Sequence, residues 1–170
     1  DYVSQQYDEK KWAVAAAAAK RVIDMGVYEL YTVKRDSTTM PLPKNVPSGD
    51  FPNGAGNIDP FKSYSDMFTG EALSQKNTEF VWGRISSNVR NYTRHAFPID
   101  NLGGWNGMAI PQKIVDAYYM VDGRDINNSS EEYPYSEIGF SSEKQSFSGY
   151  QLNNGVYNMY MNREMRFYAS

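Results

Sequence analysis

The stretch from Trp12 to Tyr31 constrains the fold of this chain most, because it predicts a strong helix that has no comparable helix to pack against. Apolar residues recur at helical spacing on one face, and charged residues occupy the other. Asp8 suits the N-cap, since its carboxylate can accept a free backbone N–H, and Gly26 suits the stop. The run Ala15–Ala19 would let a neighbouring backbone approach closely, yet no second segment has comparable length or period. We therefore expect partners for this helix from elsewhere. Its apolar face consists of Trp12, Ala15, Ala16, Ala19, Val22 and Ile23.

Composition excludes several classes of partner. A chain of 170 residues is long enough for one stable domain, but only 41% of it is apolar, aromatics reach 15%, and Asn, Ser, Gly and Pro crowd the region after residue 35. The net charge is −3, with acidic and basic residues interspersed. There is no basic stripe for nucleic acid and no polybasic patch for anionic lipid. We expect no nucleic-acid partner.

The chain lacks cysteine, which excludes disulfides, thiolate metal sites and cysteine nucleophiles. No apolar run approaches the roughly 20 residues of a membrane span, so we expect the chain itself not to cross a bilayer. It begins at Asp1 without a Met or an apolar signal segment. We therefore expect any secretion signal, and the natural start, to lie upstream or to have been removed.

Turn residues divide the rest of the chain into short elements and long loops. Periodicity predicts two further helical pieces, and one apolar run predicts a buried strand. Trp12 and Trp82 are expected in the core, and Tyr118 and Tyr119 are expected to be one buried and one exposed. The expected order is an extended segment at Val27–Val33, a Pro-rich loop at 34–60, helical turns within Phe61–Leu73, a buried strand or extended segment at Glu79–Ile85, a second loop at 86–107, a short helix after Pro111 that ends at Val121-Asp122-Gly123, and mostly irregular structure at 124–156.

Four segments carry distinctive motifs in a fixed order. The first, WAVAAAAAKRVIDMGVYELY at 12–31, joins a Trp and an Ala-rich stretch to a VID-G-Y-LY ending before a Pro-rich loop. The others are NTEFVWGRI at 77–85, PQKIVDAYYMVDGRDI at 111–126 and NREMRFYAS at 162–170. Their order and spacing resemble those of the SusD/RagB family of surface lipoproteins from Bacteroidetes. The last segment departs from the family pattern, with Glu164 and Met165 where Asp and Pro are usual.

The resemblance implies a mainly α fold: a tetratricopeptide-like helical scaffold with long irregular loops and a few short strands. It covers nearly the whole chain but only a middle-to-late portion of the family's length. We therefore expect 1–170 to be a single incomplete domain segment. Within it, residues 1–33 would be a scaffold helix and turn, and residues 34–170 a loop-rich insertion with short helices. Missing scaffold helices would explain the unpaired helix.

The same resemblance implies binding rather than catalysis. It points to a lipid-anchored protein at the surface of the cell outer membrane that captures a glycan for a SusC-like TonB-dependent transporter. The anchor, absent from this chain, would be its only contact with the membrane, and no cofactor is expected. Two alternatives stay open: a peptide-binding relative, and a transporter lid that makes little ligand contact.

Residues 88–106 contain the side chains that a glycan site needs. Sugars present apolar C–H faces and paired hydroxyls, so their sites combine exposed aromatic rings with amides or guanidinium groups. Trp105, flanked by glycines, is the first candidate for a stacking platform, although the ring could instead anchor its own loop. The family's binding loops vary between members, so no site residue carries over from the motifs. The predicted ligand-binding residues are Trp105, Tyr92, Arg94, Asn91, Asn101 and Asn106.

The sequence gives little indication of an enzyme or of a metal site. The zinc-protease, serine-hydrolase and P-loop motifs are absent, and the single histidine, His95, lies in a polar segment typical of a surface residue. The alternation Asp125, Asn127, Ser129, Glu131 echoes the start of an EF-hand loop. Serines stand where that loop needs Gly and a bidentate Glu, so we interpret the segment as a solvated turn.

Overall fold

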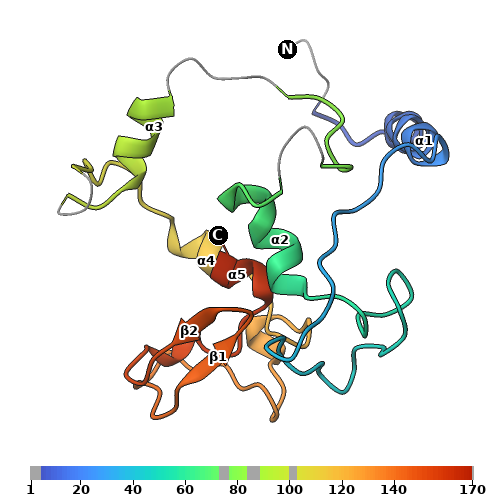
Figure 1. The fold of residues 1–170 in the computed structure, drawn as a ribbon. Helices are drawn as coiled ribbons and strands as arrows, with labels where there is room; N and C mark the ends of the chain where they lie inside the picture. Colours follow the sequence, from blue (N-terminus) through green and yellow to red (C-terminus); the bar gives the residue numbers. More distant parts are fainter. Residues whose placement is uncertain (1–4, 73–76, 84–88, 100–102, 170) are drawn as a thin grey trace.

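The structure is a computed structural model that describes residues 5–72, 77–83, 89–99 and 103–169 (Figure 1). Its regular elements are mainly helical and are joined by long irregular segments. None of the helices in these ranges combines the length and hydrophobicity of a transmembrane span. The elements are α1 (Glu9–Asp24), α2 (Pro60–Thr69), α3 (Val89–Ala96), α4 (Gln112–Asp116) and α5 (Met165–Ala169), the 3-10 turns η2 (Ile126–Asn128) and η3 (Asn158–Tyr160), and the strands β1 (Gln145–Phe147) and β2 (Tyr150–Leu152).

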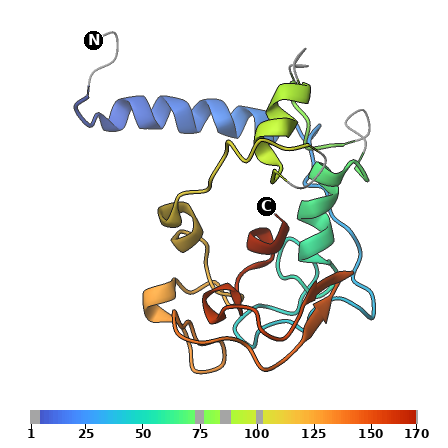
Figure 2. The ribbon, with the colours of Figure 1, turned by 90° about the vertical axis from the view of Figure 1, so that its left-hand side faces the viewer.

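Helix α1 begins and ends as its sequence predicts. The Asp8 carboxylate accepts a hydrogen bond from the Lys10 amide at 3.0 Å, and Gly26, with φ 60°, follows the C-cap Met25. The helix extends away from the body of the molecule (Figure 2), and none of its residues is buried. Its apolar face is therefore uncovered by the described part of the chain.

The prediction that Trp12 and Trp82 belong to the core is wrong for this structure. Trp12 is 65% exposed and Trp82 is 79% exposed. Of the buried strand or extended segment expected at Glu79–Ile85, residues 84 and 85 lie outside the described residues, and the described part contains no strand. It touches the rest of the chain through contacts such as the Glu29 amide donating to the Thr78 carbonyl at 3.3 Å. Neither indole has an apolar layer of described residues over it, so motif position alone did not indicate burial.

The core lies in the C-terminal part of the chain, where α2 packs on α5 beside the β1–β2 hairpin (Figure 1). Aromatic rings dominate it: Phe61 of α2 meets Phe147 of β1 edge to face at 5.6 Å between centroids. The helical turns expected within Phe61–Leu73 are thus present as α2. The buried cluster consists of Phe147, Leu152, Met161, Met165 and Tyr168.

Residues 124–156 are mostly irregular, as expected, but they also contain a short hairpin that the sequence did not indicate. Strands β1 and β2 pair antiparallel, with Phe147 opposite Tyr150. The two turn residues both have positive φ, 51° at Ser148 and 88° at Gly149, which matches the twist of a tight hairpin. Three-residue strands are too short for alternation to stand out in the sequence, so the pairing was missed.

The Pro-rich loop at 34–60 is confirmed as irregular, and backbone contacts close it at its base. Lys34 and Ile58 form an isolated antiparallel bridge, and the Asp59 amide donates to the Val33 carbonyl at 2.8 Å. The extended segment expected at Val27–Val33 has no regular strand pairing. The loop therefore leaves and re-enters the body at one point, beside the start of α2.

Arg163 ties the short helix α4 to the C-terminal segment. Its fully buried guanidinium donates to the carbonyls of Val115 at 2.7 Å, Tyr118 at 2.8 Å and Met159 at 3.1 Å. Carbonyls at the end of a helix have no partner within the helix and carry partial negative charge, so they suit a buried cation. The predicted helix after Pro111 is present as α4, but it ends at Asp116 and not at Val121-Asp122-Gly123. Tyr119 is exposed, as expected for one of the two tyrosines, whereas Tyr118 is half-buried and not buried.

Candidate ligand-binding site

The segment predicted as a second loop, 86–107, contains a helix instead. Helix α3 covers Val89–Ala96 and stands at the opposite end of the molecule from the hairpin (Figure 1). It has no continuous aliphatic face, which is why hydrophobic periodicity did not indicate it. Arg94 and His95 lie in its last turn, where basic side chains complement the helix dipole.

The chain turns back after α3 and pairs its backbone with the end of the helix. The Trp105 amide donates to the Arg94 carbonyl at 2.7 Å, and the Gly107 amide donates to the His95 carbonyl at 3.0 Å. A Cβ at Gly104 would overlap the carbonyl oxygen of Phe97, so only glycine fits this close approach. The returning backbone thereby fixes Trp105 next to α3.

Three side chains form what we call the Trp105 cluster: Arg94, His95 and Trp105. The Arg94 guanidinium carbon lies over the indole, 5.3 Å from the ring centroid, and the His95 ring meets the indole edge on at 4.9 Å. Trp105 is 47% exposed. Its own loop therefore anchors the ring, and about half of the side chain surface remains open to solvent.

The other predicted site residues surround this cluster unevenly. Tyr92 is 65% exposed on α3, and Asn91 and Asn106 are exposed, the latter with φ 47°. Asn101 lies outside the described residues. The structure thus brings Arg94 and Trp105 into contact and keeps the other described candidates on the same helix and return segment.

A hollow of about 440 Å³ beside the Trp105 cluster is lined by Arg90, Thr93, Arg94 and Phe97. Arg90, Thr93 and Phe97 were not among the predicted site residues. The four-residue spacing of Arg90 and Arg94 would place them on one helix face, but that signal requires α3 to be recognised as a helix.

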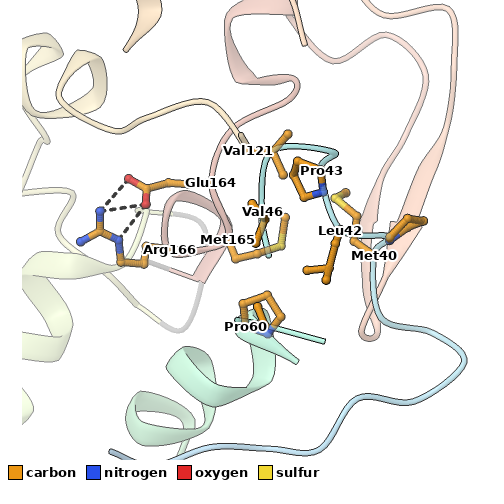
Figure 3. A pocket seen from close by; sticks show the side chains of 11 residues that line it. Met40, Leu42, Pro43, Val46, Pro60, Val121, Glu164, Met165 and Arg166 are labelled. Carbon is orange, nitrogen blue, oxygen red and sulfur yellow. Dashed lines mark hydrogen bonds and ion pairs between the residues drawn. The ribbon is translucent and has the colours of Figure 1, made fainter. Parts of the chain in front are cut away.

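A second hollow, which we call the Met40 pocket, lies between the Pro-rich loop and α5 (Figure 3). It has a volume of about 240 Å³ and an almost wholly apolar lining, with the Glu164–Arg166 ion pair at one side. Nothing in the sequence indicated this pocket. Its lining residues are Met40, Pro41, Leu42, Pro43, Val46, Ala55, Pro60, Val121, Glu164, Met165 and Arg166.

Glu164 has a structural role at the edge of this pocket. Its carboxylate accepts hydrogen bonds from the Tyr119 amide at 3.0 Å and from Arg166 Nη2 at 2.8 Å. These contacts join the end of α4 to the start of α5. They use both carboxylate oxygens, since Arg166 Nε also donates to Oε2 at 2.9 Å.

The EF-hand-like segment folds as a capped turn. The Asp125 carboxylate accepts hydrogen bonds from the Asn128 side chain at 2.8 Å and from the Asn127 amide at 2.9 Å. These bonds, led by that of Asn128, hold the pKa of Asp125 below its ordinary value. Within the described ranges, no three His, Cys, Asp or Glu side chains gather in a way that could hold a metal ion.

Comparison with known protein families identifies the family of this chain. The sequence profile of the SusD family matches residues 78–170. The chain belongs to the SusD family. The match spans α3, the Trp105 cluster, α4 and α5, and thus most of the structure around the candidate site. No match was found among curated proteins or among solved structures.

Membership of the SusD family implies a surface lipoprotein that binds glycans or peptides in nutrient uptake. Members of the family are binding proteins rather than enzymes, they generally associate with SusC-like transporters, and they typically occur at the outer membrane. The Trp105 cluster is therefore considered below as a site for ligand binding.

Proposed function

We propose that this SusD-family protein captures a glycan at the Trp105 cluster and delivers it to a partner SusC-like TonB-dependent transporter at the outer-membrane surface. A lipid anchor outside these 170 residues would hold it there. The observation that carries the proposal is the half-exposed Trp105 ring with the Arg94 guanidinium over it. An aromatic face beside fixed hydrogen-bond donors is the arrangement that sugar rings require.

The side-chain chemistry of each site residue indicates which part of the glycan it contacts. Trp105 stacks on the C–H face of a sugar ring, and Arg94 donates to paired hydroxyls at the edge of that ring. Tyr92, Asn91 and Asn106 are exposed close by in the chain and contact neighbouring sugar units. Asn101 lies outside the described residues and stays a proposed ligand-binding residue on sequence grounds alone.

The exposed face of α1 supports a proposal about the rest of the fold. We infer that residues 1–33 are one element of a tetratricopeptide-like scaffold and that residues 34–170 are a loop-rich insertion in it. Trp12, Val22 and Ile23 all lie on the exposed face of α1. Burying side chains of this size is worth roughly 1.5–3 kcal/mol each, so a covering helix layer would gain considerable stability.

Peptide binding is the second candidate function, and the Met40 pocket favours it. A pocket of about 240 Å³ with an apolar lining has room for one apolar side chain, and the Glu164–Arg166 pair beside it offers charged partners for a peptide backbone. In that case affinity would depend on Met40 and Met165 rather than on Trp105.

Affinity electrophoresis of the protein through gels that contain soluble polysaccharides tests the proposal. Circular dichroism confirms that the sample is folded, and a casein digest serves as competitor. Retardation by one polysaccharide, unaffected by the digest, is the expected result. Retardation that the digest abolishes would favour the peptide function. A folded sample that no polysaccharide retards and no peptide binds would favour a transporter lid and contradict the proposal.

A further inference from the structure

The region around the Trp105 cluster is locally basic in an acidic chain. The described segments 89–99 and 103–115 contain two arginines, one lysine and no aspartate or glutamate, whereas the whole chain carries a net charge of −3. The described basic residues of α3 are Arg90, Arg94 and His95, and this helix contains no Asp or Glu. A ligand that approaches this surface therefore meets an excess of positive charge.

Arg90 and Arg94 have no ion pair with any described residue, although both line the same hollow. Two arginines elsewhere in the structure show the contrast. Arg166 pairs with Glu164 at 2.8 Å, and Arg163 is surrounded by backbone carbonyls. Two arginines on one hollow repel each other unless an anion lies between them, so this arrangement suits an anionic group.

The cation–π contact of Arg94 with Trp105 leaves the N–H groups of Arg94 able to bind a ligand. The Arg94 guanidinium carbon lies 5.3 Å from the centroid of the Trp105 ring, and the N–H groups of a guanidinium all lie in its own plane. No hydrogen bond joins these N–H groups to a described residue. The planar fork of donors of a guanidinium matches the two oxygens of a carboxylate or a sulfate ester.

We propose that the glycan is acidic, with a uronate carboxylate or a sulfate ester held by Arg94 and Arg90 while a sugar ring stacks on Trp105. The inference rests on the proposed function and names its substrate class. The anionic group would lie in the hollow that Arg90 and Arg94 line, beside the sugar ring that stacks on Trp105. Binding would weaken as salt screens the charges, because the site is open to solvent.

The test compares polymers that differ only in charge. Polygalacturonate is compared with its methyl ester, and dextran sulfate with dextran. Each polymer is included in the gel through which the folded protein migrates in affinity electrophoresis. The proposal predicts that at least one acidic polymer binds about tenfold or more tightly than its neutral counterpart. Which acidic polymer binds distinguishes a uronate from a sulfate ester.

Variants then assign the effect to the two arginines. Arg94→Gln and Arg90→Gln should each weaken binding of the acidic polymer about fivefold to tenfold, and Arg94→Lys should recover only part of the loss, because it keeps the charge without the planar fork. Lys113→Gln removes the same charge from α4, outside the hollow, and should change affinity less than about twofold.

Three results would overturn the inference. One is equal binding of a neutral polymer and its acidic counterpart, which would leave glycan binding intact but its acidic character wrong. Another is a loss in Lys113→Gln as large as that in Arg94→Gln. The third is binding of a short single-stranded DNA with the same arginine dependence, which would indicate a general polyanion surface. Failure of every polysaccharide to bind would instead contradict the proposed function itself.

Discussion

The hydroxyl of Ser148 donates a hydrogen bond to the carboxylate of Asp59 at 2.7 Å, although the two residues lie 89 positions apart in the chain. Asp59 is fully buried and caps α2 by accepting from the Lys62 amide at 3.0 Å. The Thr39 hydroxyl donates to the same carboxylate at 2.9 Å. One side chain therefore joins the Pro-rich loop, the start of α2 and the turn of the hairpin.

Replacement of Asp59 by Ala should destabilise the protein by about 2–4 kcal/mol, because it removes a helix cap and leaves two buried hydroxyls without an acceptor. Urea unfolding followed by circular dichroism measures the loss. Asp50→Ala, an exposed aspartate of the same loop, serves as the control and should cost less than about 0.5 kcal/mol. Similar losses in both variants would show that Asp59 does not join these segments.

The second stability prediction concerns Gly149, in the turn between β1 and β2. Its φ of 88° is readily accessible to glycine and strained for alanine, so Gly149→Ala should destabilise the protein by about 1–2 kcal/mol. Gly49→Ala is the matched control, since an added methyl group there meets open space and no positive φ is involved. Thermal unfolding of the two variants compares them. An unaltered midpoint in Gly149→Ala would contradict the assigned turn.

Because of Tyr168, we expect the protein to become less stable in alkali. Its hydroxyl donates to the Tyr160 carbonyl at 2.8 Å, and burial raises the pKa of Tyr168 to about 12. A raised pKa means that the folded state favours the protonated phenol, so this contribution is complete below about pH 10 and is lost as pH rises from 10 towards 12.

Urea unfolding at several pH values between about 9 and 11.5 checks this behaviour. Tyr168→Phe should be less stable at neutral pH by about 1–2 kcal/mol, since it loses the hydrogen bonds, and should show a flatter decline in alkali. Tyr7→Phe changes an exposed tyrosine and should retain the decline of the unaltered protein. An equally steep decline in Tyr168→Phe would exclude this residue as its source.

Sequence patterns identified the elements that local chemistry specifies. Helix α1 has its cap and stop residues within the chain, and α2 has Asp59 and Pro60 at its start and Gly70, with φ 92°, at its end. The SusD family was also recognisable, because its motifs are spread over the chain in order. These signals need no knowledge of tertiary contacts.

Patterns failed where contacts between distant residues decide the structure. Helix α3 is polar, so its existence depends on the return segment that pairs with its end rather than on an apolar stripe. The strands of the hairpin are too short for alternation to show. Its turn, Ser148-Gly149, is held by the hydrogen bond from Ser148 to the buried Asp59, which lies far away in the sequence. The Met40 pocket joins residues more than 100 positions apart. Such a site cannot be predicted from local spacing.

At the candidate site, the sequence predicted the central pair but not its setting. Trp105 and Arg94 were selected for their chemistry, and the structure places them in contact. The contribution of Arg90 was missed, because a residue four positions earlier faces the same hollow only when the segment is helical.

The affinity of Trp105→Ala for the polysaccharide that binds the unaltered protein tests the central claim most directly. Trp82→Ala is the matched control, since it removes an equally large and more exposed indole outside the cluster. Isothermal titration calorimetry on both folded variants gives the comparison. The account predicts that Trp105→Ala loses at least about tenfold in affinity, or about 1.4 kcal/mol, while Trp82→Ala binds as the unaltered protein does. Unchanged affinity in Trp105→Ala would contradict the proposal that this ring holds the glycan.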